Sequence, residues 1–252
     1  MFVDLNADMG ESFGPWVMGN DQALLDIVTS ANVACGFHGG DPDVMLKTMR
    51  LAAQNGVGIG AHPGFHDLQG FGRHRLHIPI ATLQNQIRYQ IGAAQAMAKA
   101  AGTALRHVKL HGALSNMTCE DQDMARACYE AALSVAPDLI MMVLTASEQE
   151  KAVKALGCSW VGEIFADRAY NEDATLVDRK KAGAVIHNAK IAGPRIAQMV
   201  KEGAIITETG KRIPAKIDTI CLHGDTPEAL DIAKSVRSAL ESEGIILRAF
   251  EG

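Results

Sequence analysis

Six of the nine histidines in this sequence of 252 residues gather, together with carboxylates, in six short segments. The segments are Asn6-Ala-Asp-Met-Gly-Glu11, Cys35-Gly-Phe-His-Gly-Gly-Asp41, Gly60-Ala-His-Pro-Gly-Phe-His66, His107-Val-Lys-Leu-His-Gly112, Glu163-Ile-Phe-Ala-Asp-Arg168 and His223-Gly-Asp225. Imidazole and carboxylate groups transfer protons near neutral pH, and both also bind divalent metal ions. Either chemistry requires elements that bring the six segments together.

Each polar segment lies within or directly after a short apolar run that is typical of a β-strand. The predicted strands are residues 2–7, 31–35, 57–61, 106–110, 139–144, 160–165, 218–222 and 245–249. Helical stretches alternate with them, which predicts parallel strands in a β/α barrel or an open doubly wound sheet. The length suits one barrel, so we expect a single domain over residues 1–252. The carboxyl ends of the strands carry the active site in such folds, and the six segments should meet there.

Capping residues and glycines mark the helices between these strands. Asp41-Pro42 should open a helix that Gly56 closes, and Thr226-Pro227 should open another that ends at Gly244. The remaining predicted helices span residues 79–101 and 120–136.

Two stretches depart from the strand and helix repeat. Residues 166–193 are polar and predict a long loop with short helical turns, and residues 204–216 predict a small hairpin. Because they add to the repeat, we expect these stretches to be insertions, and we take them as the candidates for contact with partner proteins.

Two of the predicted strands place three polar side chains each on one face, because residues two apart on a strand point the same way. These are Asp4, Asn6 and Asp8 on the first strand and His107, Lys109 and His111 on the fourth. A barrel interior is normally filled by branched apolar residues. Inward polar groups carry a desolvation cost that a functional site would explain.

Some of these polar residues also have an ordinary structural interpretation. Asp41 before Pro42 is expected to be a helix cap, and His107 lies deep enough in its strand to be a hydrogen-bonded core residue. Lys109 could pair with Asp4 or Asp8, or it could stabilise negative charge on a substrate oxygen. The histidines expected at the surface are His66, His74, His77 and His187. The histidines and aspartate for which function is favoured are Asp8, His38, His62 and His111.

Composition and missing motifs exclude several classes of function. A net charge of −5 and an isoelectric point near 6.0 argue against nucleic acid as a partner. Five scattered cysteines without a CxxC pair predict reduced thiols, and the lack of a long apolar run predicts a cytoplasmic protein without membrane contact. The motifs of phosphate loops, dinucleotide folds and serine hydrolases are all absent. General acid-base or metal-assisted hydrolysis remains.

Six segments, taken in order along nearly the whole chain, resemble the LamB/YcsF family, which corresponds to the A subunit of bacterial ATP-dependent 5-oxoprolinase. The segments are Asp4-Leu-Asn-Ala-Asp-Met-Gly-Glu11, Ser30-Ala-Asn-Val-Ala-Cys-Gly-Phe-His-Gly-Gly-Asp41, Gly60-Ala-His-Pro-Gly-Phe65, His107-Val-Lys-Leu-His-Gly112, Phe165-Ala-Asp-Arg-Ala-Tyr170 and Cys221-Leu-His-Gly-Asp225. Leu110 and Ser115 depart from the Pro and Tyr that the family often shows there.

The resemblance implies an irregular seven-stranded β/α barrel, similar to the polysaccharide deacetylases, rather than a barrel of eight strands. It also implies an enzyme that cleaves 5-oxo-L-proline to L-glutamate while ATP is hydrolysed to ADP and phosphate. The implied partners are 5-oxoprolinase subunits B and C. ATP would then be a co-substrate handled largely by those partners, in keeping with the missing phosphate loop.

On this resemblance we expect the partners to phosphorylate the lactam carbonyl and water to attack in the barrel. Asp8 and His62 would activate the water with His38 beside them, while Lys109 and His111 would stabilise charge on oxygen. The substrate-binding residues would be Asn6, Arg168, Arg179, His223 and Asp225. Among these, the two arginines would hold the substrate carboxylate and His223 with Asp225 would complete the rim.

The sequence leaves open whether the site binds a divalent metal ion. Asp8, His38 and His62 could form a site with two histidines and one carboxylate, as in the deacetylases. The paired carboxylates and the His-x-x-x-His motif of those enzymes are absent from this sequence.

Two other functions also stay open. A stand-alone, metal-dependent deacetylase of N-acetylated sugars would release acetate without ATP. A non-catalytic subunit that only binds a lactam would need few titratable groups, and the many inward polar residues argue against it.

Overall fold

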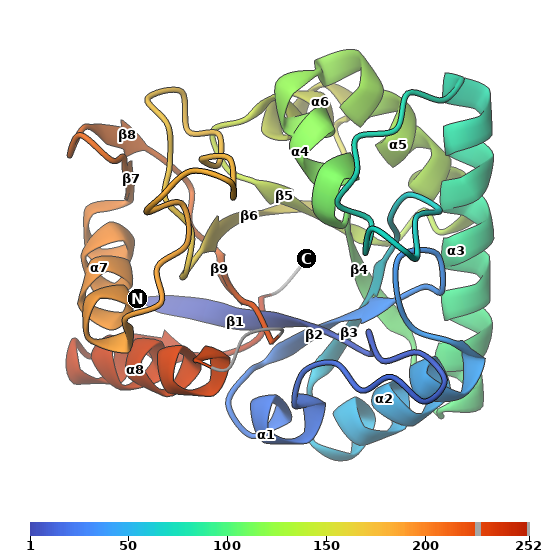
Figure 1. Cartoon of the computed structure of the whole chain (residues 1–252), viewed down its shortest axis with the longest axis horizontal. Helices are drawn as coiled ribbons and strands as arrows, with labels where there is room; N and C mark the ends of the chain where they lie inside the picture. Colours follow the sequence, from blue (N-terminus) through green and yellow to red (C-terminus); the bar gives the residue numbers. More distant parts are fainter. Residues whose placement is uncertain (225–227, 251–252) are drawn as a thin grey trace.

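The fold is a closed barrel of seven parallel strands surrounded by helices, as the resemblance implied (Figure 1). A computed structural model describes residues 1–224 and 228–250 of the chain. The barrel strands are β1 (Phe2–Met9), β2 (Ser30–Ala34), β3 (Gly58–His62), β4 (Leu105–Lys109), β5 (Ile140–Leu144), β6 (Trp160–Phe165) and β9 (Thr219–Leu222). Each strand pairs with the next in this order, and β9 pairs with β1 to close the ring.

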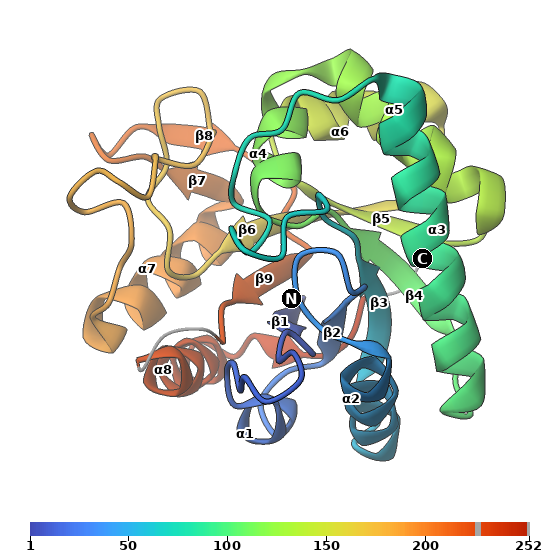
Figure 2. The ribbon, with the colours of Figure 1, turned by 45° about the vertical axis from the view of Figure 1, so that its right-hand side comes forward.

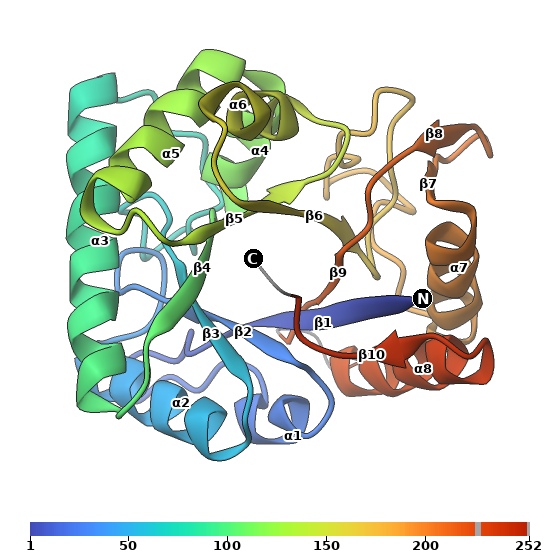
Figure 3. The same cartoon turned by 180° about the vertical axis from the view of Figure 1, so that it is seen from behind.

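The eighth predicted strand, residues 245–249, is not part of this ring. Only Ile246–Leu247 forms a strand, β10, and it pairs with Phe2 and Val3 (Figure 3). Because β9 first pairs with β1 at Asp4, the first two residues of β1 keep a free edge that β10 covers. The count of eight strands was therefore one too many for the barrel.

The helices lie outside the strands, with α3 on one side of the barrel and α7 and α8 on the other (Figure 1). They are α1 (Asp21–Leu25), α2 (Pro42–Gln54), α3 (Ile80–Ala100), α4 (Gly112–Glu120), α5 (Gln122–Val135), α6 (Glu148–Leu156), α7 (Ala189–Glu202) and α8 (Ala229–Ser242). Asp41 caps α2 as predicted, because its carboxylate accepts from the amides of Asp43 and Val44. Within the described part of the chain, no helix is both long and apolar enough to cross a membrane.

Among the described residues, four helices were not predicted from the sequence: α1, α4, α6 and α7. Residues 120–136 are confirmed as α5, but α4 precedes this helix directly and had not been predicted. Helix α7 begins at Ala189, inside the predicted loop 166–193. Residues Thr226 and Pro227, predicted to open the last helix, lie outside the described residues.

The two irregular stretches lie together on one side of the barrel (Figure 2). Residues 204–216 form the predicted hairpin, with β7 (Ala204–Ile206) antiparallel to β8 (Arg212–Pro214). The Glu208 amide donates to the carbonyl of Tyr170, and Lys211 donates to the carbonyl of Glu172. The hairpin therefore supports the loop that precedes α7.

A buried carboxylate, that of Asp4, lies inside the barrel near the amino ends of the strands. Asp4 is fully buried, and its carboxylate accepts hydrogen bonds from Thr29, Ser30 and Thr219. These bonds join β1 to β2 and β9. Burial outweighs them and raises the pKa of Asp4 from 3.8 to about 6.

We expect the stability contributed by Asp4 to depend on pH. Because the folded pKa exceeds the unfolded one, the contribution is fully present below pH 4 and is lost as the pH rises through 6. Relative to Asp4→Asn, the wild-type chain should gain about 2 kcal/mol of unfolding free energy between pH 7 and pH 4. Urea denaturation at several pH values measures this difference.

Asp123→Asn, at an exposed position of α5, controls for the loss of one carboxylate. A difference between wild type and Asp4→Asn that stays constant across this pH range would contradict the burial argument.

Candidate active site

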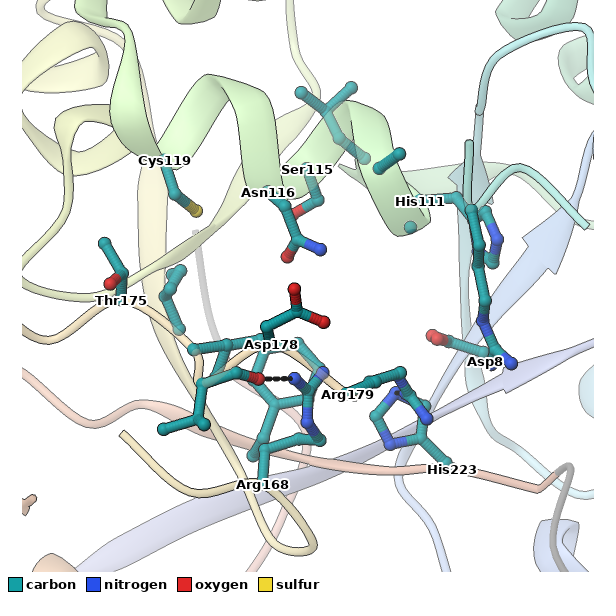
Figure 4. Close-up of a pocket in the computed structure, with 18 of the residues that line it drawn as sticks. Asp8, His111, Ser115, Asn116, Cys119, Arg168, Thr175, Asp178, Arg179 and His223 are labelled. Atoms are coloured by element: carbon teal, nitrogen blue, oxygen red, sulfur yellow. Dashed lines mark hydrogen bonds between the residues drawn. The ribbon is translucent and has the colours of Figure 1, made fainter. Parts of the chain in front are cut away.

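A cavity of about 480 Å³ opens at the carboxyl ends of the barrel strands, where the polar segments were predicted to meet (Figure 4). Its floor includes Asp8 from β1, His62 from β3 and Lys109 from β4. Its wall includes Ser115 and Asn116 of α4 and Arg179 of the loop before α7. Strands therefore provide the floor, whereas a helix and a loop provide the wall.

Lys109 is the positive centre of the floor. Its ammonium lies 2.8 Å from Asp8 Oδ1, 3.1 Å from Glu163 Oε1 and 2.9 Å from the sulfur of Cys221. Burial alone would lower the pKa of Lys109, but the Asp8 and Glu163 carboxylates hold it well above its ordinary value. Lys109 therefore stays protonated although its side chain is almost fully buried.

Asp8 connects this ammonium to the histidines. Its Oδ2 lies 3.3 Å from His62 Nε2, and its Oδ1 accepts from Asn32 at 2.9 Å. Burial alone would raise the pKa of Asp8, but His62 and Lys109 hold it well below its ordinary value. Asp8 is therefore an ionised carboxylate at the cavity surface.

Three histidines lie beside Asp8. The rings of His38 and His111 stack with their centroids 3.5 Å apart, and the ring of His62 stands edge-on to both. Glu11 Oε1 lies 3.2 Å from His38 Nε2 and 3.7 Å from His111 Nδ1. Burial lowers the pKa of His38 and of His111 well below the ordinary value, so both rings are neutral.

A polar column beneath the floor holds these groups in place. Asn32 donates to Asn6 at 2.7 Å, and its own carbonyl oxygen lies 2.7 Å from His107 Nε2. Gly60 makes room for that ring, since a Cβ at this position would lie 2.2 Å from His107. His107 is therefore a hydrogen-bonded core residue, as its structural interpretation predicted. Asn6, predicted to bind substrate, lies below the cavity rather than on its surface.

His223 and two arginines line the cavity next to Asp8 and across from Ser115 and Asn116 of α4 (Figure 4). Both Asp167 oxygens lie 2.8 Å from His223 Nδ1, and Arg179 Nη2 lies 3.3 Å from His223 Nε2. Arg168 donates through Nη2 and Nε to the carbonyls of Val177 and Ala184. One edge of the Arg168 guanidinium is thus occupied by the loop backbone.

The structure brings together most of the predicted residues. Asp8, His62, Lys109 and His111 line the cavity, while His38 is fully buried behind His111. The predicted substrate-binding residues Arg168, Arg179 and His223 also line it. Asp225 lies outside the described residues.

Sequence reasoning passed over three carboxylates of this site. Glu163 and Asp167 belong to a polar segment that was noticed, and Glu163 shares the inward face of β6 with Phe165, two residues on. Glu11 comes two residues after the end of β1, where strand periodicity no longer predicts direction.

Groups of donors that could hold a metal differ from the predicted set. Among the described residues, donor atoms of Glu11, His38, His62 and His111 lie within 4.8 Å of one another, as do those of Asp8, Cys221 and His223. The predicted combination of Asp8, His38 and His62 is divided between the two groups.

Known proteins share this fold and much of this sequence. A family model described as "LamB/YcsF family" matches residues 3–252. A relative from Ruegeria pomeroyi, named as the A subunit of 5-oxoprolinase, is 67% identical over 99% of this chain and 98% of its own length. A "Lactam Utilization Protein" from Thermus thermophilus superimposes with a TM-score of 0.93 at 42% identity, covering 99% of this chain and 100% of its own.

A more distant structure extends the comparison for the fold alone. The catalytic domain of a peptidoglycan N-acetylglucosamine deacetylase from Eubacterium rectale matches with a TM-score of 0.51 at 12% identity. The match covers 99% of this chain and 88% of that one. The expected likeness to the polysaccharide deacetylase barrel is thereby confirmed.

We expect Lys109→Met to be about 3–5 kcal/mol less stable than wild type at pH 7, because it leaves Asp8 and Glu163 buried without a counter-charge. Adding Glu163→Gln should restore part of this loss, since it removes one of the two buried charges. Urea denaturation measures both variants.

Arg75→Met is the matched control, because the ion pair of Arg75 with Glu120 is about half exposed and should contribute less than about 1 kcal/mol. Equal losses for Lys109→Met and Arg75→Met would show that Lys109 does not neutralise buried charge.

Proposed function

The chain belongs to the LamB/YcsF family, and from this premise we propose that it is the A subunit of an ATP-dependent 5-oxoprolinase, in which the lactam ring is opened. The reaction converts 5-oxo-L-proline to L-glutamate while ATP is hydrolysed to ADP and phosphate. The observation that carries the proposal is the pairing of Asp8 with Lys109 and His62 on the cavity floor.

Once the carbonyl oxygen carries the phosphoryl group, an activated water adds to the carbonyl carbon and the C–N bond breaks, with a proton going to the ring nitrogen. A second water then displaces phosphate from the resulting acyl phosphate to leave the carboxylate of glutamate. Asp8, an ionised carboxylate at the cavity surface, accepts the proton of the attacking water, and His62 positions that carboxylate from 3.3 Å. Lys109 places a fixed positive charge 2.8 Å from the same carboxylate, where it can stabilise negative charge on the phosphorylated oxygen of the substrate. His111 provides a further polar contact beside them.

The residues next to Asp8 and across from α4 suit the remaining needs of the substrate. Arg179 can hold the substrate carboxylate, because its guanidinium reaches the cavity beside His223. Arg168 contributes differently from the bidentate role predicted for it, since its Nε and Nη2 already hold the loop backbone. His223 is oriented by Asp167 through Nδ1, and its Nε2 accepts from Arg179, so His223 positions that guanidinium. The proton for the leaving nitrogen is then the one that Asp8 takes from the attacking water.

Partner subunits B and C complete the proposed reaction. The sequence lacks a phosphate loop, so we assign ATP and the phosphorylation of the lactam carbonyl to those partners. The cavity supports delivery of an anionic, phosphorylated lactam, because basic side chains gather at its lining. They are Arg73, Arg75, Lys109, Arg168, Arg179, Lys180 and Lys181.

The proposal is tested by glutamate release from 5-oxo-L-proline, measured for the purified chain alone and mixed with candidate B and C subunits. We expect glutamate only in the complete mixture with ATP, because the chain needs an activated lactam. Acetate release from an N-acetylated sugar by the chain alone, without ATP, would instead identify a deacetylase.

In the complete mixture, we expect Asp8→Asn to lower kcat by about 100-fold or more, because the amide cannot accept a proton from water. Asp123→Asn on the exposed face of α5 should keep wild-type activity. Full turnover by a folded Asp8→Asn variant would remove Asp8 from the reaction.

A further inference from the structure

Two ring nitrogens in the histidine cluster face each other at short range. His62 Nε2 and His111 Nδ1 are 3.0 Å apart. The other nitrogen of each ring contacts a backbone carbonyl: His62 Nδ1 lies 2.8 Å from Lys109 O, and His111 Nε2 lies 2.8 Å from Phe71 O. Carbonyl oxygens only accept, so these outer nitrogens carry hydrogens, and the facing nitrogens are left as the donors of lone pairs to a proton or to a metal ion.

Two facing lone pairs repel each other unless a proton or a metal ion lies between them. From this geometry we infer a site for a divalent transition metal of the class of zinc, held by Glu11, His62 and His111 at the edge of the cavity. Neutral imidazole is a preferred ligand of such ions, and a carboxylate adds the negative charge that favours a dication over a single proton.

The spacing of the donor atoms fits a single ion. Ligands bonded at about 2.0–2.1 Å around a tetrahedral zinc lie about 3.3 Å from one another. The separation of the His62 and His111 nitrogens is 3.0 Å, and Glu11 Oε1 lies 3.7 Å from His111 Nδ1. Small side-chain movements would equalise these distances.

The surroundings of the three ligands are those of a prepared metal site. Metal-binding histidines usually donate their second ring nitrogen to a carbonyl or carboxylate, as His62 and His111 do. His38 holds the carboxylate of Glu11, with its Nε2 3.2 Å from Oε1, and stacks on His111. His38 Nδ1 is buried and has no hydrogen-bond partner among the described residues.

An ion at this position would keep an open side toward the cavity. Glu11, His62 and His111 line the cavity, whereas His38 closes the back of the cluster. Asp8 Oδ2 lies 3.3 Å from His62 Nε2 and so borders the open side. A bound ion of this class polarises a carbonyl oxygen or lowers the pKa of a bound water.

The test is metal binding by the full chain, which does not depend on any reaction. After chelator treatment and dialysis, the chain is titrated with Zn²⁺ in a calorimeter and with Co²⁺ under visible absorption. We expect one ion per chain and the intense visible bands of low-symmetry, tetrahedral-like Co²⁺. His111→Ala and Glu11→Gln should each weaken Zn²⁺ binding by at least about 100-fold, and His38→Ala by about 10–100-fold.

Controls separate this site from other sources of binding. His74→Ala, in an exposed loop, should bind like wild type. Cys221→Ser tests the second group of donors: loss of binding there, with binding retained in folded His111→Ala, would overturn the inference. Absence of stoichiometric binding by a chain with an unchanged circular dichroism spectrum would overturn it as well. A chain that binds zinc but yields no glutamate with competent partners would refute the proposed function and leave the metal site standing.

Discussion

The ammonium of Lys109 inside the barrel is the interaction on which the rest of the site depends. Two carboxylates lie within 3.1 Å of it, and all three groups are nearly excluded from water. A buried charge is tolerated only when partners compensate it closely. Asp8 can remain an ionised carboxylate at the cavity floor because this ammonium is fixed beside it, and Glu163 supplies a second negative charge that keeps the ammonium itself protonated.

The barrel strands keep these charges apart from the apolar core by placing apolar side chains on their outward face and polar side chains on their inward face. Along β1, Leu5 and Ala7 pack in the apolar core with the helices, while Asn6 and Asp8 face inward. Below the floor, hydrogen bonds from Asn32 join β1, β2 and β4 and leave few orientations open to Asp8. An interior of branched apolar residues would pack as well, but it could not hold a carboxylate and an ammonium in fixed positions.

Strand periodicity predicted the inward faces of β1 and β4, because alternation of side chains is a local property of extended backbone. It did not predict Glu11, whose direction depends on the turn after β1, nor the contact of Arg168 with the loop backbone. The prediction of eight strands failed at Ile246–Leu247 because a short apolar run can pair with a free edge outside the ring. Hydrogen-bonded tautomers such as those of His62 arise from three-dimensional contacts that no spacing encodes.

The loop before α7 is held from both sides, by Arg168 on the barrel side and by the β7–β8 hairpin on the outside. It carries Thr175, Asp178 and Arg179 to the cavity wall without contributing a strand to the barrel. Substitutions in this wall can therefore change the shape and charge offered to a substrate while the catalytic floor keeps its geometry. Within this architecture, selectivity can diverge among descendants of one ancestor while the bond-breaking chemistry is inherited unchanged.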